Sequence, residues 1–527
     1  MMKKLLLLTI FSFAISLCFA TTPDSTRMRL PLPPRTHKPL PKVRLDNQRS
    51  NFELTNLVVF IRFADDPEID KTFTEIDQIF NDSSANAMSV YNYFDAMSYG
   101  KIHYNTVYTN QIQNNTIVSY CDSHPRCYFE PYSVNNPDGY PPFSPDSICP
   151  RERQLLADAL HYIDSLHLVD PDINLDGNED GFIDNISFIV KGGCGAWASL
   201  LWPHMEFFND EPYPVTVNGV APYTYNFELE GSGYYFSTNV FCHEMSHSLG
   251  LPDLYHYYNY TDVDPVGIWD VMGHNNMQQL STILKYKFLG LIDEPVQITE
   301  DGTYTLYSNA SSDTHNCYYI KSSIDSTQWY TFEYRNKYDY MDNVYSSGLI
   351  IGRWVDTMDV NDIYSSGNEH FDFFHNAHSY WVFRPGSSID TLDGNLNSAA
   401  FNANKPNFGP RTNPHPYLTD GTPENSFEIT EIHEEGGMLS FHVHFLNTSV
   451  EENLSDDIHL YPNPTSDILR VSGENIHSVE INNMLGANIL SIANPGHVID
   501  VSALPQGIYI VKISTNNGIY VKKIIKR

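Results

Sequence analysis

The stretch FCHEMSHSLGLPD, Phe241–Asp253, constrains the fold of this chain more than any other segment. His243 and His247 are four residues apart, so on a helix both imidazoles lie on one face and can bind the same metal ion. Glu244 lies about 100° around the helix from His243, where its carboxylate can reach a water molecule beside that ion and act as a general base. The sequence therefore predicts a metal site built on a helix.

The residues after His247 predict a sharp turn and a third ligand. Gly250 stands where helices commonly end in a left-handed turn, and Pro252 prevents the helix from resuming. Asp253 follows with a carboxylate that can complete a set of three protein ligands and leave the fourth position of a catalytic zinc ion open. The alternative is two surface histidines on an ordinary helix, which the added Gly250 and Asp253 disfavour.

Length and composition predict a folded protein with several domains. A chain of 527 residues is too long for a single core and suggests about two to four domains. Apolar residues make up 41% of the chain and aromatic residues 13%, which excludes a disordered protein and favours strands. Leu54–Phe63 predicts a central strand, whereas Ser89–Gly100, Arg151–Leu166 and Ile283–Leu291 have helical spacing. We therefore expect an α+β fold.

The N-terminal residues predict export. Two lysines, the apolar run Leu5–Phe19 and Ala20 form the three regions of a secretory signal over residues 1–20. Lipid attachment at Cys18 is the weaker alternative, because its flanking sequence fits a lipoprotein site poorly. Residues 21–50 are basic and rich in proline, which excludes a helix. They are either a flexible spacer or an inhibitory pro-segment that lies across an acidic cleft.

The charge of the chain excludes some partners and suggests calcium. A net charge of −33 argues against binding to nucleic acid or to anionic membrane surfaces. Within Asp172–Asp184, four residues have the spacing of calcium-loop ligands: Asp176, Asn178, Asp180 and Asp184. Ser187 stands where an EF-hand has its bidentate glutamate, so the match is incomplete. The alternative is a polar turn before a strand.

Cysteine positions suggest one local disulfide. In an exported protein, Cys121 and Cys127 span a short loop that a disulfide could close. Cys242 stands beside His243, but we expect it to face the core rather than the metal.

A second motif follows the metal helix. Val266–Gly273, VGIWDVMG, places Met272 in a tight turn, as in zinc proteases of the metzincin kind, where such a methionine forms an apolar floor beneath the ligands. His274, two residues later, is a candidate donor for stabilising an oxyanion, and the alternative is a solvent-facing histidine.

Several segments together resemble the immune inhibitor A family of secreted bacterial zinc metalloproteases, over about Leu54 to Phe445. They are FCHEMSHSLGLPDLY, GIWDVMG, LWPH, DGNEDGFIDN and YFDAMSYGKI. The resemblance implies a metzincin-like protease domain over residues 51–292, with a twisted mixed sheet and an active-site helix, and a β-rich subdomain over 293–446. It also implies zinc binding by His243, His247 and Asp253, with Glu244 as the catalytic base.

The C-terminal residues form a separate segment. Leu460–Ser472 and Val501–Ile513 alternate apolar and polar residues, as expected for a small antiparallel β-sandwich over 457–527, after a linker over 447–456. They resemble the C-terminal sorting domain of the type IX secretion system of Bacteroidota. This resemblance implies passage across the outer membrane and often attachment at the cell surface. An accessory β-sandwich for substrate or wall binding is the alternative.

These features together predict a secreted zinc endopeptidase. Its substrates would be proteins or peptides, and its export partner would be the type IX secretion machinery. We expect a monomer without a transmembrane segment in the mature chain. The alternative is a non-catalytic, calcium-stabilised surface adhesin that retains the protease fold.

Overall fold

The computed structural model describes residues 51–109, 112–141, 145–195, 199–208, 214–233, 236–256, 263–274, 276–356, 368, 378–387, 394–446, 458–473, 475–484, 486–515 and 518–527. The expected signal, pro-segment or spacer, and linker (residues 1–20, 21–50 and 447–456) lie outside these residues. The chain divides into two compact units, Met1–His444 and Phe445–Arg527. Each unit is described here by itself.

A mixed sheet organises the first unit. In the described chain it has six strands in the order β2-β1-β7-β10-β8, with β5 beside β1. Strand β8 is antiparallel to β10, and the other pairs are parallel. Strand β1 is buried along most of its length, which confirms the central strand predicted at Leu54–Phe63. The strands are β1 (Phe52–Arg62), β2 (Ile102–Tyr108), β5 (Tyr120–Cys121), β7 (Asn185–Val190), β8 (His204–Phe207) and β10 (Thr224–Leu229).

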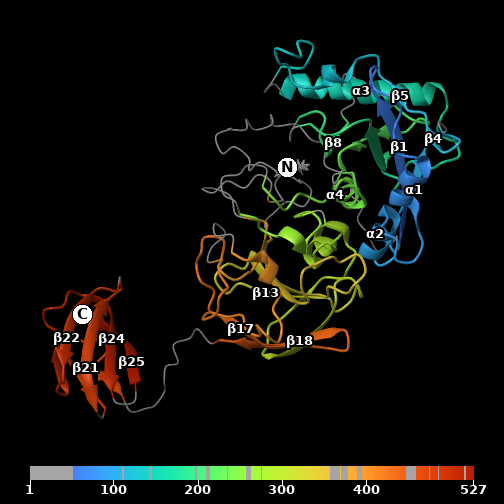
Figure 1. Ribbon diagram of the computed structural model, residues 1–527. Helices are drawn as coiled ribbons and strands as arrows, with labels where there is room; N and C mark the ends of the chain where they lie inside the picture. Colours follow the sequence, from blue (N-terminus) through green and yellow to red (C-terminus); the bar gives the residue numbers. More distant parts are fainter. Residues whose placement is uncertain are drawn as a thin grey trace, which may run out of the picture. The chain divides into compact units, whose positions relative to one another are not determined.

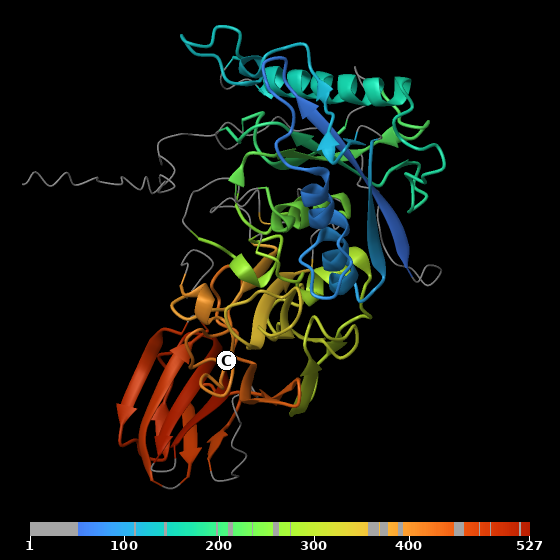
Figure 2. The same ribbon diagram turned by 45° about the vertical axis from the view of Figure 1, so that its right-hand side comes forward.

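Helices cover both faces of this sheet. On one face, α3 (Pro145–Ser165) packs its leucines against the strands. On the other face lie α1 (Phe73–Asn81), α2 (Val90–Met97) and α4 (Thr238–Ser248), which share a second core cluster. Figures 1 and 2 show α3 and α4 on opposite sides of β1. Because successive side chains of a strand point to opposite faces, alternate strand residues contact different helices.

Helix α2 confirms the helix predicted within Ser89–Gly100. The Ser89 hydroxyl caps its first turn by accepting a hydrogen bond from the Asn92 backbone N–H at 3.1 Å. Gly100 has a φ of 75° and ends the following turn. Helix α3 confirms the helix predicted at Arg151–Leu166 but begins several residues earlier, at Pro145.

The helix predicted at Ile283–Leu291 is present in a modified form. Helix α5 (Thr282–Leu284) continues into a π-helical turn, Lys285–Leu289, and Gly290 with a φ of 62° ends it. Other short elements are β3 (Ile112–Gln113), β4 (Thr116–Ile117), β6 (Phe182–Ile183), β9 (Ala221–Pro222) and the 3-10 turns Arg126–Phe129, Gly267–Trp269 and Leu396–Ser398.

The β-rich segment after residue 292 extends the same core. Trp329, Trp354 and Tyr380 belong to the cluster of buried apolar residues that also contains residues of α2 and α4. This segment therefore packs as part of the first unit. Its larger sheet has the order β11 (Val296–Gln297), β13 (Cys317–Lys321), β14 (Gln328–Arg335), β15 (Gly348–Val355), β16 (Tyr380–Val382); its smaller sheet has the order β12 (Gly302–Tyr307), β18 (Met438–Phe445), β17 (Phe427–Glu435).

The second unit is a small β-sandwich. Residues of both its sheets, among them Leu469, Val479 and Val511, share one buried core. One sheet has the order β19 (His459–Tyr461), β20 (Ile468–Ser472), β23 (Val498–Asp500), and the other has the order β22 (Asn488–Ala493), β21 (Ile476–Asn483), β24 (Gly507–Thr515), β25 (Gly518–Lys526).

The described chain is thus a mixed α/β protein with many strands and few helices. None of the helices among these residues is long and apolar enough to cross a membrane. Cys121 and Cys127 are free thiols, so the predicted local disulfide is not formed. Instead, the Cys121 sulfur accepts a hydrogen bond from the Arg62 guanidinium at 3.1 Å. Cys242 is fully buried, as predicted.

Candidate metal centre

Helix α4 ends in the left-handed turn that the sequence predicted. Gly250 has a φ of 92°, and its N–H donates to the His247 carbonyl at 2.9 Å. The Leu251 N–H donates to the Ser246 carbonyl at 3.3 Å, which reverses the chain. The reversal carries Asp253 back to the face of α4 that bears the histidines.

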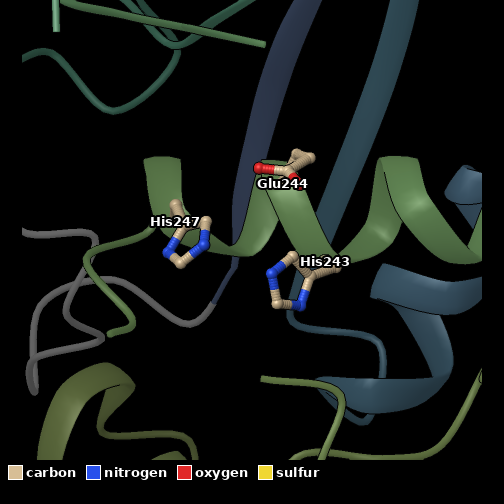
Figure 3. Close-up of side chains that lie close together, drawn as sticks. All are labelled: His243, Glu244 and His247. Carbon is tan, nitrogen blue, oxygen red and sulfur yellow. The ribbon is translucent and has the colours of Figure 1, made fainter. Parts of the chain in front are cut away.

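The structure brings the four predicted site residues together. Asp253 Oδ1 lies 3.1 Å from His243 Nε2 and 3.4 Å from His247 Nε2. The two imidazoles leave the same side of α4, with Glu244 on the turn between them (Figure 3). His243, Glu244 and His247 are buried, and their potential ligand atoms lie within 4.8 Å of one another.

Backbone carbonyls hold both imidazoles in place. His243 Nδ1 lies 2.8 Å from the Val271 carbonyl oxygen, and His247 Nδ1 lies 2.7 Å from that of Leu251. Because a carbonyl only accepts hydrogen bonds, Nδ1 of each ring must donate, which directs Nε2 towards Asp253. Metal-binding histidines are oriented in this way by their second ring nitrogen.

The electrostatics of the cluster favour a bound cation. Burial opposes protonation of His247, but Asp253 outweighs this effect and raises its pKa to about 9. The pKa of His243 is also raised, against the effect of burial, by its hydrogen bond to Asp253. Burial alone would raise the pKa of Asp253, but the two imidazoles lower it well below its usual range. A metal ion could replace these imidazole protons, since metal binding to histidine releases them.

The donor set fits zinc. Two imidazole nitrogens and a carboxylate oxygen are common ligands of catalytic zinc. Donor atoms about 2.0–2.1 Å from a tetrahedral zinc ion lie about 3.3 Å apart. The two distances from Asp253 Oδ1, 3.1 and 3.4 Å, lie on either side of this value. Small adjustments of side chains would therefore suffice to coordinate the ion.

Met272 lies in a tight turn next to α4, as predicted. It is fully buried, and its carbonyl accepts a hydrogen bond from the Leu254 N–H, next to Asp253, at 2.8 Å. Its own N–H donates to Asp270 Oδ1 at 2.8 Å. The Val271 carbonyl in the same turn holds His243. The turn thus contacts both segments that bear the candidate ligands, α4 and the segment of Asp253.

His274 is exposed, unlike His243, Glu244, His247 and Asp253, which are buried. Its backbone N–H donates to the Asp270 carbonyl at 3.1 Å, and its carbonyl accepts from Asn276. These contacts fix the backbone and do not direct the imidazole to the ligands. The oxyanion role of His274 stays a prediction.

A buried arginine connects the β-rich segment to the turn of Met272. Arg335, at the end of β14, is fully buried and donates to the Trp269 carbonyl, to Asp342 and to Glu333 Oε1. Glu333 Oε2 in turn accepts from the Thr282 N–H at 2.6 Å. This network was not evident from the sequence, because its members are far apart along the chain.

Replacing Arg335 with alanine is expected to destabilise the protein by about 3–5 kcal/mol, because it leaves Asp342 and Glu333 buried without their cation. Urea unfolding of the first unit measures this change. In a double-mutant cycle, Asp342→Ala should lower the free energy of unfolding much less in the Arg335→Ala background than in the wild type. Additive effects of the two substitutions would show that the ion pair between Arg335 and Asp342 does not stabilise the protein.

The predicted calcium loop is ordered by its own backbone. Asp176 accepts hydrogen bonds from the N–H groups of Asp180 and Gly181 at 2.9 and 3.0 Å. Asp184 accepts from the Thr55 and Gly177 N–H groups, and burial raises its pKa to about 6. Among the described residues, these carboxylates do not form a group of three within 4.8 Å. Calcium binding stays a prediction.

Two buried residues near α4 were missed at the sequence level. Asn226 and Glu228 lie on β10 and are completely buried. The signal that could have identified them is the sequence TYNFEL, in which polar and apolar residues alternate. In a strand that is covered on both faces, such alternation places polar side chains in the interior.

Comparisons with curated proteins and with solved structures do not identify the fold of the chain. No curated protein matches the chain. One similar solved structure belongs to a study of PorZ, described as an essential bacterial surface component of the type-IX secretion system of Porphyromonas gingivalis. It is 11% identical, with a TM-score of 0.13, over 40% of this chain and 30% of that one. The score is too low to support an argument about the fold.

The family comparison agrees with the predicted C-terminal segment. Residues 459–527 match the family described as the secretion system C-terminal sorting domain. These residues form nearly all of the described part of the second unit. The tail implies interaction with the type IX secretion machinery, and the protein is secreted or attached to the cell surface.

Proposed function

We propose that this protein is a secreted zinc-dependent endopeptidase that hydrolyses peptide bonds of extracellular proteins. One observation carries the proposal: Asp253 Oδ1 lies 3.1 and 3.4 Å from the Nε2 atoms of two histidines that backbone carbonyls orient. Glu244 stands beside these ligands without being needed to complete the set of three. A site that bound zinc only to stabilise the fold would not require another protonatable side chain beside its three ligands.

His243, His247 and Asp253 would hold the zinc ion. When bound, zinc would supply Lewis acidity, which acidifies a water molecule and polarises a peptide carbonyl. Glu244 would accept a proton from the attacking water at its carboxylate and deliver it to the nitrogen of the leaving amine. The hydrogen bonds of the Val271 and Leu251 carbonyls would keep the imidazoles fixed during this transfer.

The fold is compatible with this proposal. A mixed sheet, a helix that bears the two histidines and a buried methionine turn occur in the order that a metzincin-like domain requires. The metzincin-like architecture is part of the proposal, together with the assignment of the β-rich segment to the same protease module.

Metal analysis combined with casein hydrolysis tests the proposed function. Protein freed of residues 1–50 is expected to contain about one zinc ion per chain, to lose casein hydrolysis on chelation and to regain it when zinc is returned. Zinc-loaded protein without activity would instead favour the non-catalytic adhesin.

A structural calcium ion in the loop Asp172–Asp184 is a separate prediction. Adding calcium to chelator-treated protein is expected to raise the midpoint of thermal unfolding, because a ligand that binds only the folded state stabilises it. Asp176→Ala should remove the response. An equal calcium response in both proteins would place the ion elsewhere.

A further inference from the structure

The segment that carries Asp253 is held by two separate parts of the fold. The turn of Met272 holds it through the Leu254 N–H, which donates to the Met272 carbonyl at 2.8 Å. The residues at the start of β16 form the second contact. There, His256 Nε2 lies 2.6 Å from His378 Nε2, so a hydrogen bond joins the two imidazoles. The β-rich segment therefore takes part in placing the candidate ligand.

Asn368 makes most of this second contact. Its backbone N–H donates to the Asp253 carbonyl at 2.9 Å, and its Nδ2 donates to the Leu254 carbonyl at 3.0 Å. The same Nδ2 donates to the Tyr380 carbonyl at 3.0 Å, and Oδ1 accepts from the Ser379 N–H at 2.8 Å. Asn368 thus joins the segment of Asp253 to the start of β16.

The side chain of Asn368 suits this place closely. It is 1% exposed, so its amide cannot exchange these partners for bulk water. A carboxamide offers two N–H donors and an acceptor oxygen. The two donors meet the carbonyls of Leu254 and Tyr380, and the oxygen meets the Ser379 N–H. Because an unmade hydrogen bond is costly in the interior, this arrangement fixes the groups that the amide joins.

We infer that Asn368 is a positioning residue for Asp253. Its hydrogen bonds fix the carbonyl of Asp253 itself and that of the next residue, Leu254. The Asp253 carboxylate is thereby held where its Oδ1 lies 3.1 and 3.4 Å from the two imidazole nitrogens. Residues that orient metal ligands in this way contribute about 10–100-fold to metal affinity. The inference rests on the proposed function, because Asn368 would act through a ligand of the proposed zinc ion.

The zinc affinity of Asn368→Ala tests the inference. The variant keeps the backbone bond to Asp253 but loses the side-chain bonds to Leu254 and to β16. Competition with a chromophoric chelator, at a temperature where the metal-free protein is folded, should show a zinc Kd about 10–100-fold above that of the wild type. Asn316→Ala is the matched control and should keep the wild-type Kd. It removes another buried asparagine of the same unit, whose Nδ2 donates to the Ser312 carbonyl at 2.7 Å.

A double-mutant cycle separates positioning of Asp253 from a general effect on the fold. In the Asp253→Ala background, Asn368→Ala should change the zinc Kd by no more than about twofold, because the ligand that it positions is gone. A side chain that only stabilised the fold would raise the Kd by the same factor in both backgrounds. Equal factors, or a wild-type Kd in Asn368→Ala, would overturn the inference.

A second variant covers the case in which Asn368→Ala does not fold. Asn368→Ser keeps a small polar group, but its hydroxyl is too short to bond both Leu254 and Ser379, so the same rise in Kd is expected. Cobalt(II) in place of zinc adds a spectroscopic readout, since its visible absorption depends on its ligands and geometry. The bands of either variant should shift towards those of Asp253→Ala, and wild-type bands in both variants would overturn the inference.

The same measurements distinguish failure of this inference from failure of the proposed function. A wild-type zinc Kd in Asp253→Ala would overturn the proposed ligand set, and the inference with it. Weak zinc binding by Asp253→Ala, combined with wild-type binding by the Asn368 variants, would overturn only the positioning role.

Discussion

Replacing Glu244 with glutamine is expected to lower kcat for casein hydrolysis by about 10²–10⁴-fold, with zinc content unchanged. The glutamine side chain keeps the size of Glu244 but cannot accept the proton of the attacking water. The three proposed ligands and the carbonyls that orient the imidazoles are untouched by the change. Initial rates and metal analysis on the same preparation measure both quantities.

The outcome also decides between two roles for Glu244. Its carboxylate lies within 4.8 Å of potential ligand atoms of both histidines, so ligation by Glu244 is the structural alternative. Loss of zinc together with activity would support that alternative, and retention of full kcat would show that another group carries the proton. Glu294→Gln, an exposed carboxylate of the same unit, is the control and should behave as the wild type.

Replacing Asp253 with alanine is expected to lower zinc affinity by at least about 100-fold, because even residues that only support metal ligands contribute about 10–100-fold. The variant keeps both imidazoles but removes the oxygen that lies 3.1 and 3.4 Å from their Nε2 atoms. Activity should be lost at zinc concentrations that saturate the wild type.

Thermal unfolding of chelator-stripped protein, with and without added zinc, measures this loss of zinc affinity. Zinc at a hundredfold excess over its Kd should stabilise the wild type by about 2.7 kcal/mol, and Asp253→Ala should show almost none of this effect at the same concentration. Asp293→Asn, which changes an exposed acidic residue, controls for the change in charge. Equal zinc responses in the wild type and Asp253→Ala would remove Asp253 from the ligand set.

Local features of the candidate metal site could be predicted from the sequence. The spacing of His243 and His247 places them on one helix face whatever surrounds the helix. Gly250 can adopt a positive φ at little cost, so the turn that returns Asp253 is also encoded locally. The apolar run of β1 and the capped helix α2 were predictable for the same reason.

Other parts of the site depend on contacts between distant segments. The Val271 carbonyl that orients His243 is 28 residues from it, and Arg335 reaches the Trp269 carbonyl across 66 residues. The prediction of a Cys121–Cys127 disulfide was wrong for a related reason. Closeness in sequence does not place two sulfur atoms together when Arg62 already engages one of them.

The sequence by itself determined the candidate ligand residues, the helix phase that pairs the histidines and the C-terminal sorting segment, because short-range geometry and motif spacing encode these features. Only the tertiary structure decided that Asp253 Oδ1 contacts both imidazoles and that Glu228 is buried behind α4. Both depend on how the sheet, α4 and the turn of Met272 pack against one another. That packing is set by long-range burial of apolar surface, which residue spacing does not specify.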